Sequence, residues 1–328
     1  MDTRKQQLIA WLTSAANIAR FDINPASADA SFRRYFRISF NGTTLIAMDA
    51  PPEKEDSARF IRLAQLLQRT GVQVPEIIEA DLSLGFLLLT DLGQTQFLNV
   101  LKSDSVDSLY RDALNTLLTL QTATLAEVRT LPTYDDALLT RELAIFDEWF
   151  VTRHLNVQWN DAQRRVWQDA CDVLKRSALE QPKVLVHRDY HSRNLMVTPQ
   201  HNPGVLDFQD AVYGPITYDV ASLLRDCYIA WPEVQVQGWA EQHRKNLVAH
   251  GVPVNDPAQF RRWFDLMGAQ RHLKAVGIFA RLHHRDGKPG YLQDIPRTLN
   301  YVLEVCSRYV ELRPLEAQLR TLPAVIKK

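Results

Sequence analysis

The sequence has few cysteines, no net charge and no long apolar run. Only three cysteines occur in 328 residues and none belongs to a C-x-x-C pair, which excludes a zinc cluster and indicates a reducing compartment. The 38 basic and 38 acidic residues cancel, so neither nucleic acid nor a membrane surface is an expected partner. No run approaches the ~20 apolar residues of a membrane span, and the first residues lack the apolar core of a signal peptide. We therefore expect a cytoplasmic protein that acts as a monomer.

The strongest motif is a group of polar residues bracketed by short apolar runs. His187, Asp189 and Asn194 form the pattern H-x-D-x-x-x-x-N, and a later apolar run ends at Asp207. The runs before His187 and after Asn194 predict short strands, so the polar groups are expected to project from strand ends into one cleft. This set suits phosphoryl transfer, because Asp189 can accept a hydroxyl proton while Asn194 and Asp207 hold Mg2+ on nucleotide phosphates. A loop with coincidental polar residues is the less favoured interpretation.

The residues after Asp207 differ from those of a protein kinase. Gln209 stands at the glycine position of D-F-G, and residues 218–221 follow so soon that no activation segment fits between them. This pattern resembles the aminoglycoside-phosphotransferase-like small-molecule kinases, a group that also contains choline and homoserine kinases. The resemblance implies ATP and Mg2+ as cofactors. It also implies that Asp219 anchors the catalytic loop from the start of a helix, and that Arg188 is structural or lies at the cleft edge.

The first ninety residues show the element order of a kinase small lobe. One side of the strand at 31–40 carries Phe32, Phe36, Ile38 and Phe40. The expected elements are a helix at 1–20, a turn at Asn24 and Pro25, strands at 31–40 and 43–48 joined by Asn41-Gly42, a helix with Glu53, Glu55 and Asp56 in its first turn, and strands at 76–80 and 86–90.

The remainder of the chain is predicted to be mainly helical. Helical periodicity covers segments near 105–124, 135–156 and 160–180, and resumes from 219 to the end. The fold class is therefore α+β: a bilobal, protein-kinase-like fold with a small antiparallel-sheet N-lobe and a mainly helical C-lobe. The expected domains are a nucleotide-binding lobe at 1–91, a hinge near 89–93, and a catalytic and substrate-binding lobe at 92–328. Backbone groups at Thr90, Asp91 and Leu92 are expected to bind adenine.

The phosphate-binding turn of this lobe lacks glycine. In this fold the turn before the first strand contacts the phosphates, and here it runs from Ser27 to Arg34 without a G-x-G-x-x-G motif. Ser31 is small enough to let backbone N–H groups approach phosphate oxygens. Arg33 and Arg34 could add positive charge.

The lysine that kinases place on the second strand of the hairpin is also missing. Its position is occupied by Met48. We favour an arginine from positions 33, 34 or 37 as the substitute, because a guanidinium makes planar, bidentate contacts with phosphates. Lys54 reaching into the site and impaired nucleotide binding are the alternatives.

The charge of the C-terminal segment bears on the substrate. Between residues 261 and 297 the chain has eight lysines and arginines against three aspartates. This excess favours a neutral or anionic substrate over an aminoglycoside or choline, although basic residues at helical spacing often form a solvated face.

Several longer segments resemble the bacterial anomeric kinases of N-acetylmuramate and N-acetylglucosamine. They are DASFRRYFR, MDAPPEKEDS, LLLTDLG, HRDYHSRNLM and QRHLKAVGIFARLHHRDGKPGYLQDIPR. The resemblance covers nearly the whole chain and implies ATP-dependent phosphorylation of the C1 hydroxyl of an amino sugar, in cell-wall recycling. The candidate partners of the muramate carboxylate are Arg225, His272, Arg281 and His284.

Two alternatives remain at this point. The chain could phosphorylate another small metabolite, such as homoserine or thiamine. It could also be a pseudokinase, which Met48 suggests and which the intact Asp189, Asn194 and Asp207 argue against.

Overall fold

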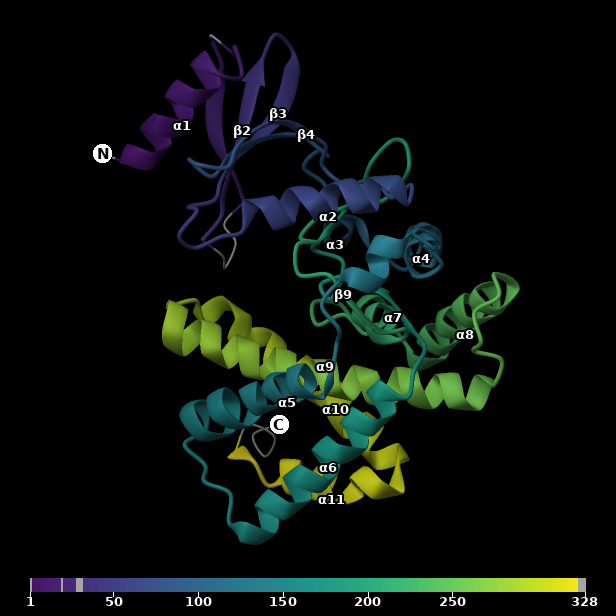
Figure 1. Cartoon of the computed structure of the whole chain (residues 1–328). Coiled ribbons are helices and arrows are strands. Elements are labelled where there is room, and N and C mark those ends of the chain that lie inside the picture. Colours follow the sequence, from purple (N-terminus) through teal and green to yellow (C-terminus); the bar gives the residue numbers. More distant parts are fainter. Residues whose placement is uncertain (1, 19, 28–31, 324–328) are drawn as a thin grey trace. The chain divides into compact units, whose positions relative to one another are not determined.

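The structure, a computed structural model, describes residues 2–18, 20–27 and 32–323, which fall into two units (Figure 1). Unit 1 contains Met1–Val100 and Arg193–Asp210, and unit 2 contains Leu101–Ser192 and Ala211–Lys328. This division differs from a single boundary at residue 91, because the segment carrying the predicted metal ligands groups with the N-terminal residues. No helix in the described ranges is both long enough and apolar enough to cross a membrane.

Unit 1 is built on one five-stranded antiparallel sheet with the order β1-β2-β3-β5-β4. Its strands are β1 (Asp22–Ser27), β2 (Arg34–Phe40), β3 (Thr43–Asp49), β4 (Ile77–Asp81) and β5 (Phe86–Thr90). The four predicted strands are confirmed to within a few residues. The turn expected at Asn24 and Pro25 is wrong, because both residues pair with β2. Pro25 is tolerated there because β1 is an edge strand, where the ladder does not require every N–H group.

The two faces of the sheet carry different side chains. Helix α1 (Thr3–Ser14) packs with Phe36 and Ile38 in one apolar cluster. Because side chains alternate along a strand, Tyr35 and Arg37 of β2 point to the opposite face, where they line a cavity. The sheet therefore has one face for the core and one face for a site.

Helix α2 (Ser57–Arg69) begins later than expected. Asp56 is its N-cap and accepts a backbone N–H bond of 2.8 Å from the first turn. Glu53 and Glu55 therefore precede the helix, which corrects their predicted place in its first turn. Phe32 likewise precedes β2 and is 61% exposed, so its predicted place on the buried side of the strand is wrong.

Short strands attach the second segment of unit 1 to the first. Strand β7 (Leu195–Met196) pairs with β8 (Gly204–Val205), and the N–H of Val205 donates to the carbonyl of Gln73 at 2.8 Å. Met196 also bridges to Gln96, just before helix α3 (Phe97–Val100). These backbone contacts explain why the segment from Arg193 belongs to this unit.

Unit 2 is mainly helical. Besides the antiparallel pair β6 (Lys183–Val186) and β9 (Val212–Pro215), it contains α4 (Val106–Gln121), η1 (Ala126–Thr130), α5 (Asp136–Ile145), the π-helix η2 (Phe146–His154), α6 (Asp161–Leu179), α7 (Tyr218–Leu224), α8 (Glu233–Ala249), α9 (Pro257–Asp286), η3 (Pro289–Asp294), α10 (Ile295–Arg308), η4 (Val310–Leu312) and α11 (Arg313–Arg320). The helices predicted near 105–124 and 160–180 are confirmed. The one predicted at 135–156 consists of α5 followed by the π-helix.

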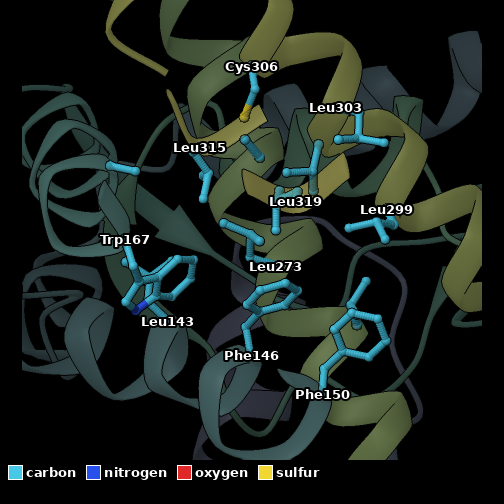
Figure 2. Close-up of a cluster of buried hydrophobic side chains, with 14 of the residues drawn as sticks. Leu143, Phe146, Phe150, Trp167, Leu273, Leu299, Leu303, Cys306, Leu315 and Leu319 are labelled. Carbon is cyan, nitrogen blue, oxygen red and sulfur yellow. The ribbon is translucent and has the colours of Figure 1, made fainter. Parts of the chain in front are cut away.

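The central element of unit 2 is the 30-residue helix α9, which contacts α5, α6, α7, α8 and α10. Figure 2 shows part of the apolar core around it, where Leu273 of α9 lies among Phe146, Leu299 and Leu319. Gly277 allows a close approach of α9 to the junction of α5 and η2. A Cβ atom at this position would lie 2.5 Å from the carbonyl oxygen of Ile145, which is backbone and cannot rotate away.

Gly277→Ala is expected to lower the midpoint of thermal unfolding, with a cost of about 1–3 kcal/mol from overpacking against backbone. Gly238→Ala in α8 is the matched control, because a Cβ atom there meets nothing within 4 Å. Alanine is the better helix former, so the control is expected to stabilise the protein by up to about 1 kcal/mol. Differential scanning fluorimetry measures both changes, and an unchanged midpoint for Gly277→Ala would contradict the packing described.

Candidate active site

A cavity of about 280 Å³ lies within unit 1. Its walls come from the site face of the sheet, from the predicted hinge and from the second segment of the unit. The lining residues include Tyr35, Arg37, Ile46, Leu89, Thr90, Asp91, Leu92, Gly93, Asn194 and Asp207. The structure thus gathers the three predicted hinge residues and the two predicted metal ligands around one cavity.

The two predicted metal ligands lie side by side at this cavity. The Nδ2 atom of Asn194 is 3.3 Å from Oδ2 of Asp207, and the backbone carbonyl of Asn194 accepts the N–H of Leu206 at 2.9 Å. Gln209 donates from Nε2 to the other carboxylate oxygen of Asp207 at 2.7 Å. Asp207 has φ +62°, in the left-handed region that costs free energy for a side chain other than glycine. Backbone and side-chain contacts therefore hold this carboxylate in one orientation.

This donor set fits Mg2+. Carboxylate and amide oxygens are hard ligands, and Mg2+ commonly takes one or two from a protein and the rest from phosphate and water. In the described ranges no cluster of three or more histidine, cysteine, aspartate or glutamate side chains could hold a metal ion. The residues present therefore match a metal bound together with a nucleotide better than a metal held by protein alone.

Arg37 ties strand β2 to the predicted hinge. Its Nε and Nη2 atoms donate to the Asp91 carboxylate at 2.6 and 3.0 Å, and Nη2 also donates to the carbonyl of Gly93 at 2.8 Å. The Asp91 carboxylate additionally accepts the N–H of Gly93 at 2.9 Å. Burial raises the pKa of Asp91, but these hydrogen bonds outweigh burial and lower the pKa below its usual value. Of the residues considered as substitutes for the missing lysine, Arg37 is the one that lines this cavity.

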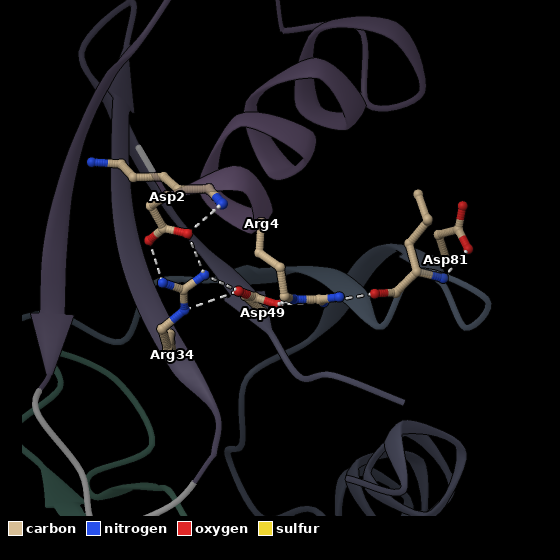
Figure 3. Close-up of polar contacts among 7 residues, drawn as sticks. Asp2, Arg4, Arg34, Asp49 and Asp81 are labelled. Carbon is tan, nitrogen blue, oxygen red and sulfur yellow. Dashed lines mark hydrogen bonds and ion pairs between the residues drawn. The ribbon is translucent and has the colours of Figure 1, made fainter. Parts of the chain in front are cut away.

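The other predicted nucleotide-binding arginines make ion pairs within unit 1. Arg34 contacts Asp2 and the fully buried Asp49, which also accepts a 2.8 Å bond from Nε of Arg4 (Figure 3). Arg33 pairs with Glu55 at 2.7 Å. Neither Arg33 nor Arg34 lines the cavity, so their role in nucleotide binding stays a prediction.

Three further positions bear on the prediction of nucleotide binding. Ser31 lies outside the described residues. Lys54 lies over the ring of Phe32, with Nζ 4.7 Å from the centroid. Met48 is fully buried in the sheet.

In unit 2, Asp219 anchors the loop that carries Asp189. Strand β6 leads into this loop, and the Asp219 carboxylate accepts the backbone N–H groups of His187 at 2.6 Å and Arg188 at 3.0 Å. Burial nevertheless raises the pKa of Asp219 to about 7. The predicted structural role of Asp219 is confirmed. Arg188 has φ +77°, so the chain turns sharply just before Asp189.

A buried carboxylate, Glu142 of α5, organises the cations around Asp189. It pairs with Arg188 at 2.5 Å and with Lys274 at 2.9 Å, and it accepts hydrogen bonds from Tyr134 and Gln270. Burial raises the pKa of Glu142, but the charges of Lys274 and Arg188 outweigh burial and lower that pKa to about 2. Arg188 thus has a structural ion pair and also lines the cavity beside Asp189, which agrees with the prediction of a structural or cleft-edge residue.

The electrostatic surroundings keep Asp189 ionised. Burial raises the pKa of its carboxyl group, but the positive charges of Lys274, His191, Arg188 and Arg271 outweigh burial and lower it below the usual value. An ionised carboxylate can orient a hydroxyl group and accept its proton.

A second cavity, of about 100 Å³, adjoins Asp189 within unit 2. The lining residues are Arg188, Asp189, His191, Tyr218, Cys227, Tyr228, Arg271, Lys274, Ala275, Ile278 and Phe279. Five of them lie on α9 at positions 271, 274, 275, 278 and 279, the spacing of one helical face. Arg271 and Lys274 were not among the predicted site residues, although their spacing in the sequence places both on one face of this helix.

The four predicted substrate-binding residues are not among those lining this cavity. Arg225 is 1% exposed and pairs with Asp265 at 2.7 Å and Glu233 at 2.8 Å. His272 has other neighbours: its Nε2 is 2.8 Å from the carbonyl oxygen of Arg225, and its ring stacks on Tyr301. Burial lowers the pKa of His272 to about 3, so its ring is neutral near pH 7.

The other two residues lie near the C-terminal end of α9. Arg281 is half-buried, and burial lowers the pKa of its guanidinium. His284 approaches His154, with Nε2 3.1 Å from Nδ1 of that ring. Nothing in these contacts tests a role in substrate binding, so all four assignments stay predictions.

Comparisons with known proteins point to one enzyme family. The model of the phosphotransferase enzyme family matches residues 22–251. The N-acetylmuramate/N-acetylglucosamine kinase of Pseudomonas putida is 47% identical over 98% of each chain. The protein of the same name from Neisseria meningitidis is 45% identical over 96% of this chain and 95% of its own.

Solved structures of low sequence identity share the fold. ADP-bound aminoglycoside phosphotransferase APH(2'')-Ib has a TM-score of 0.59 at 14% identity, covering 93% of this chain and 99% of its own. Choline kinase from Cryptosporidium parvum has a TM-score of 0.62 at 12% identity, covering 97% and 99%. Together with the antiparallel sheet and the helical remainder, they confirm the predicted kinase-like α+β fold.

Glu142→Gln is expected to destabilise the protein by about 3–5 kcal/mol at pH 7, because it leaves two buried cations without their counter-ion. The pKa of Glu142 is lower in the folded state than the ordinary value of 4.5, so its ionisation stabilises the protein above pH 4.5. That stabilisation is lost as the pH falls from about 4.5 to about 2. The difference between wild type and variant is therefore expected to shrink over this window.

Urea unfolding at several pH values measures this difference. Glu148→Gln is the matched control, because Glu148 pairs with Arg153 at the surface, where both side chains are 52% exposed. The control is expected to change stability by less than about 1 kcal/mol at any pH. A Glu142→Gln deficit as small as that of the control would rule out the buried network as a source of stability.

Proposed function

This chain belongs to the phosphotransferase enzyme family, and we propose that it transfers the γ-phosphoryl group of ATP to N-acetylmuramate and N-acetylglucosamine. The observation that carries this proposal is the 45–47% identity, over nearly the whole chain, to kinases named for these two sugars. The retained phosphoryl-transfer groups Asp189, Asn194 and Asp207 support it.

The proposed acceptor is the anomeric C1 hydroxyl, and the product is the α-1-phosphate, formed during recycling of cell-wall sugars. An anomeric hydroxyl is more acidic than an ordinary alcohol, so the ionised carboxylate of Asp189 is a sufficient proton acceptor. In the proposed step the C1 oxygen attacks the γ-phosphorus, its proton passes to Asp189, and the bond from the γ-phosphorus to ADP breaks.

Mg2+ is the proposed metal, and Asn194 and Asp207 are the residues that would hold it. When bound, it neutralises charge on the β- and γ-phosphate oxygens. Gln209 contributes by donating to Asp207 and so fixing the orientation of that carboxylate.

Nucleotide binding is assigned to the cavity of unit 1. We propose that backbone groups at Thr90, Asp91 and Leu92 bind adenine and that Arg37 supplies the positive charge nearest to them. Since ATP is the donor, we keep the proposal of a cytoplasmic protein. We also keep the proposal of a monomer with no nucleic-acid or membrane partner, which the balanced net charge supports.

Turnover is expected with both free sugars in the presence of ATP and Mg2+, and it is expected to disappear with their 1-O-methyl glycosides, which have no C1 hydroxyl. Coupled measurement of ADP release checks this, with an aminoglycoside as the negative control. Equal turnover of the methyl glycosides would move phosphorylation to another hydroxyl. A silent panel would favour a different metabolite as acceptor.

Two substitutions separate the proton acceptor from the metal ligands. Asp189→Asn is expected to lower kcat by about 10²–10⁴-fold while ATP affinity stays nearly unchanged, because the proton acceptor is lost. Asp207→Asn is expected to weaken ATP binding only when Mg2+ is present. Calorimetric titration with ATP, with and without Mg2+, measures both, and the exposed Asp210→Asn serves as the control. Retained turnover in Asp189→Asn would reject Asp189 as the proton acceptor.

A further inference from the structure

Arg271 is a buried cation that makes no ion pair among the described residues, although the charges of Asp189 and Asp226 act on it. Its side chain belongs to the central helix α9 and is 6% exposed. In the part of the chain that the structure describes, its one hydrogen bond runs from Nη1 to the sulfur of Cys227, at 3.7 Å. Burial raises the pKa of the Cys227 thiol, so this partner is neutral near pH 7. A guanidinium taken out of water and left with a neutral thiol is costly, which is unusual for a purely structural arginine.

Two charged residues near Arg271, Lys274 and Asp226, have other partners. Lys274 pairs with Glu142 at 2.9 Å and donates to the hydroxyl of Tyr218 at 3.1 Å. Asp226, an acidic residue whose charge influences Arg271, accepts the N–H and the hydroxyl of Ser192 at 2.9 and 2.5 Å. It also accepts a further 2.9 Å bond from a backbone N–H group. Arg271 makes no ion pair among the described residues, so its guanidinium has donors left for a ligand.

The cavity around Arg271 suits a small group that combines charge with apolar surface. A water-sized group needs about 10–15 Å³ of such volume, so about 100 Å³ admits several of them. Tyr228 lines one wall, 5.4 Å from the ring of His191 and 6.3 Å from that of Phe279. A carboxylate could bind the guanidinium in a bidentate manner while an attached methyl group contacts these rings. Asp189 lines the same cavity, so the ligand is part of the acceptor substrate.

We propose that Arg271 binds the carboxylate of the lactyl ether of N-acetylmuramate and thereby sets the preference for the acidic sugar over the neutral one. The inference rests on the proposed function and adds the residue that distinguishes the two acceptors. N-acetylglucosamine carries a hydroxyl in place of the lactyl ether, so this contact contributes nothing to its phosphorylation. A role of Arg271 in binding the transferred phosphoryl group would instead affect both sugars equally.

Steady-state kinetics with both sugars tests this in Arg271→Gln. The kcat/KM for N-acetylmuramate is expected to fall about ten- to a hundredfold, the usual worth of a charge-assisted hydrogen bond, mainly through KM. For N-acetylglucosamine it is expected to stay within about threefold of wild type. Arg271→Lys keeps the charge but loses the planar fork, so an intermediate loss confined to the acidic sugar is expected. Arg285→Gln, which removes an exposed arginine of the same helix, is the control expected to affect neither sugar.

The proposed contact between Arg271 and the carboxylate can also be tested by changing the substrate. The methyl ester of N-acetylmuramate removes the charge of the lactyl group and adds one methyl group, and wild type is expected to use it about ten- to a hundredfold less well than the acid. In Arg271→Lys and Arg271→Gln this preference is expected to shrink.

The outcomes separate the two proposals. Equal losses on both sugars, or an undiminished preference for acid over ester in the variants, would overturn the role of Arg271. Should Arg271→Gln not fold, the acid-to-ester ratio of Arg271→Lys decides. Failure of wild type to phosphorylate either sugar would instead reject the proposed function itself.

Discussion

The arrangement around Asp189 depends on one buried carboxylate. Glu142 pairs with Arg188 and Lys274, and the charges of both cations also act on Asp189. A catalytic carboxylate paired directly with two cations would be a poor proton acceptor, because each contact would stabilise its ionised form. Glu142 pairs with both cations, and their charges still lower the pKa of Asp189, which lines the cavity. Helix α5 thus determines the chemistry of a loop that lies about fifty residues further along the chain.

Backbone hydrogen bonds fix the two ends of the catalytic motif in different ways. Asp219 holds the start of the loop through two N–H groups, whereas the carbonyl of Asn194 holds the strand end that leads to Asp207. The unusual φ angles of Arg188 and Asp207 occur next to these anchors. Such conformations persist only where surrounding contacts compensate for them, and they are common at functional sites.

The sequence predicted most of the sheet because strands depend on local patterns, and the proposed phosphoryl-transfer groups also come from a local motif. Alternation predicted which side of β2 is apolar, and the spacing of H-x-D-x-x-x-x-N predicted the loop. It did not predict that the segment from Arg193 groups with the N-terminal unit, since β7, β8 and their backbone bonds are not local features. The acceptor cavity was missed for a similar reason. The number of basic residues in this segment of the sequence does not show where each side chain points. The packed helix shows that Arg271 lines a cavity with Asp189, whereas His272 contacts the carbonyl of Arg225.

An unpaired buried arginine also explains how one cavity could serve both an acidic and a neutral sugar. A site that hydrogen-bonds a substrate group usually rejects analogues without it, because binding leaves buried polar groups unpaired. Among the described residues, the one hydrogen-bond partner of the Arg271 guanidinium is a thiol, so binding a neutral acceptor adds little to the free-energy cost of burying this cation. An acidic acceptor removes that cost. Under the proposed function, discrimination therefore arises from a gain with N-acetylmuramate rather than from a penalty against N-acetylglucosamine, and both sugars remain substrates.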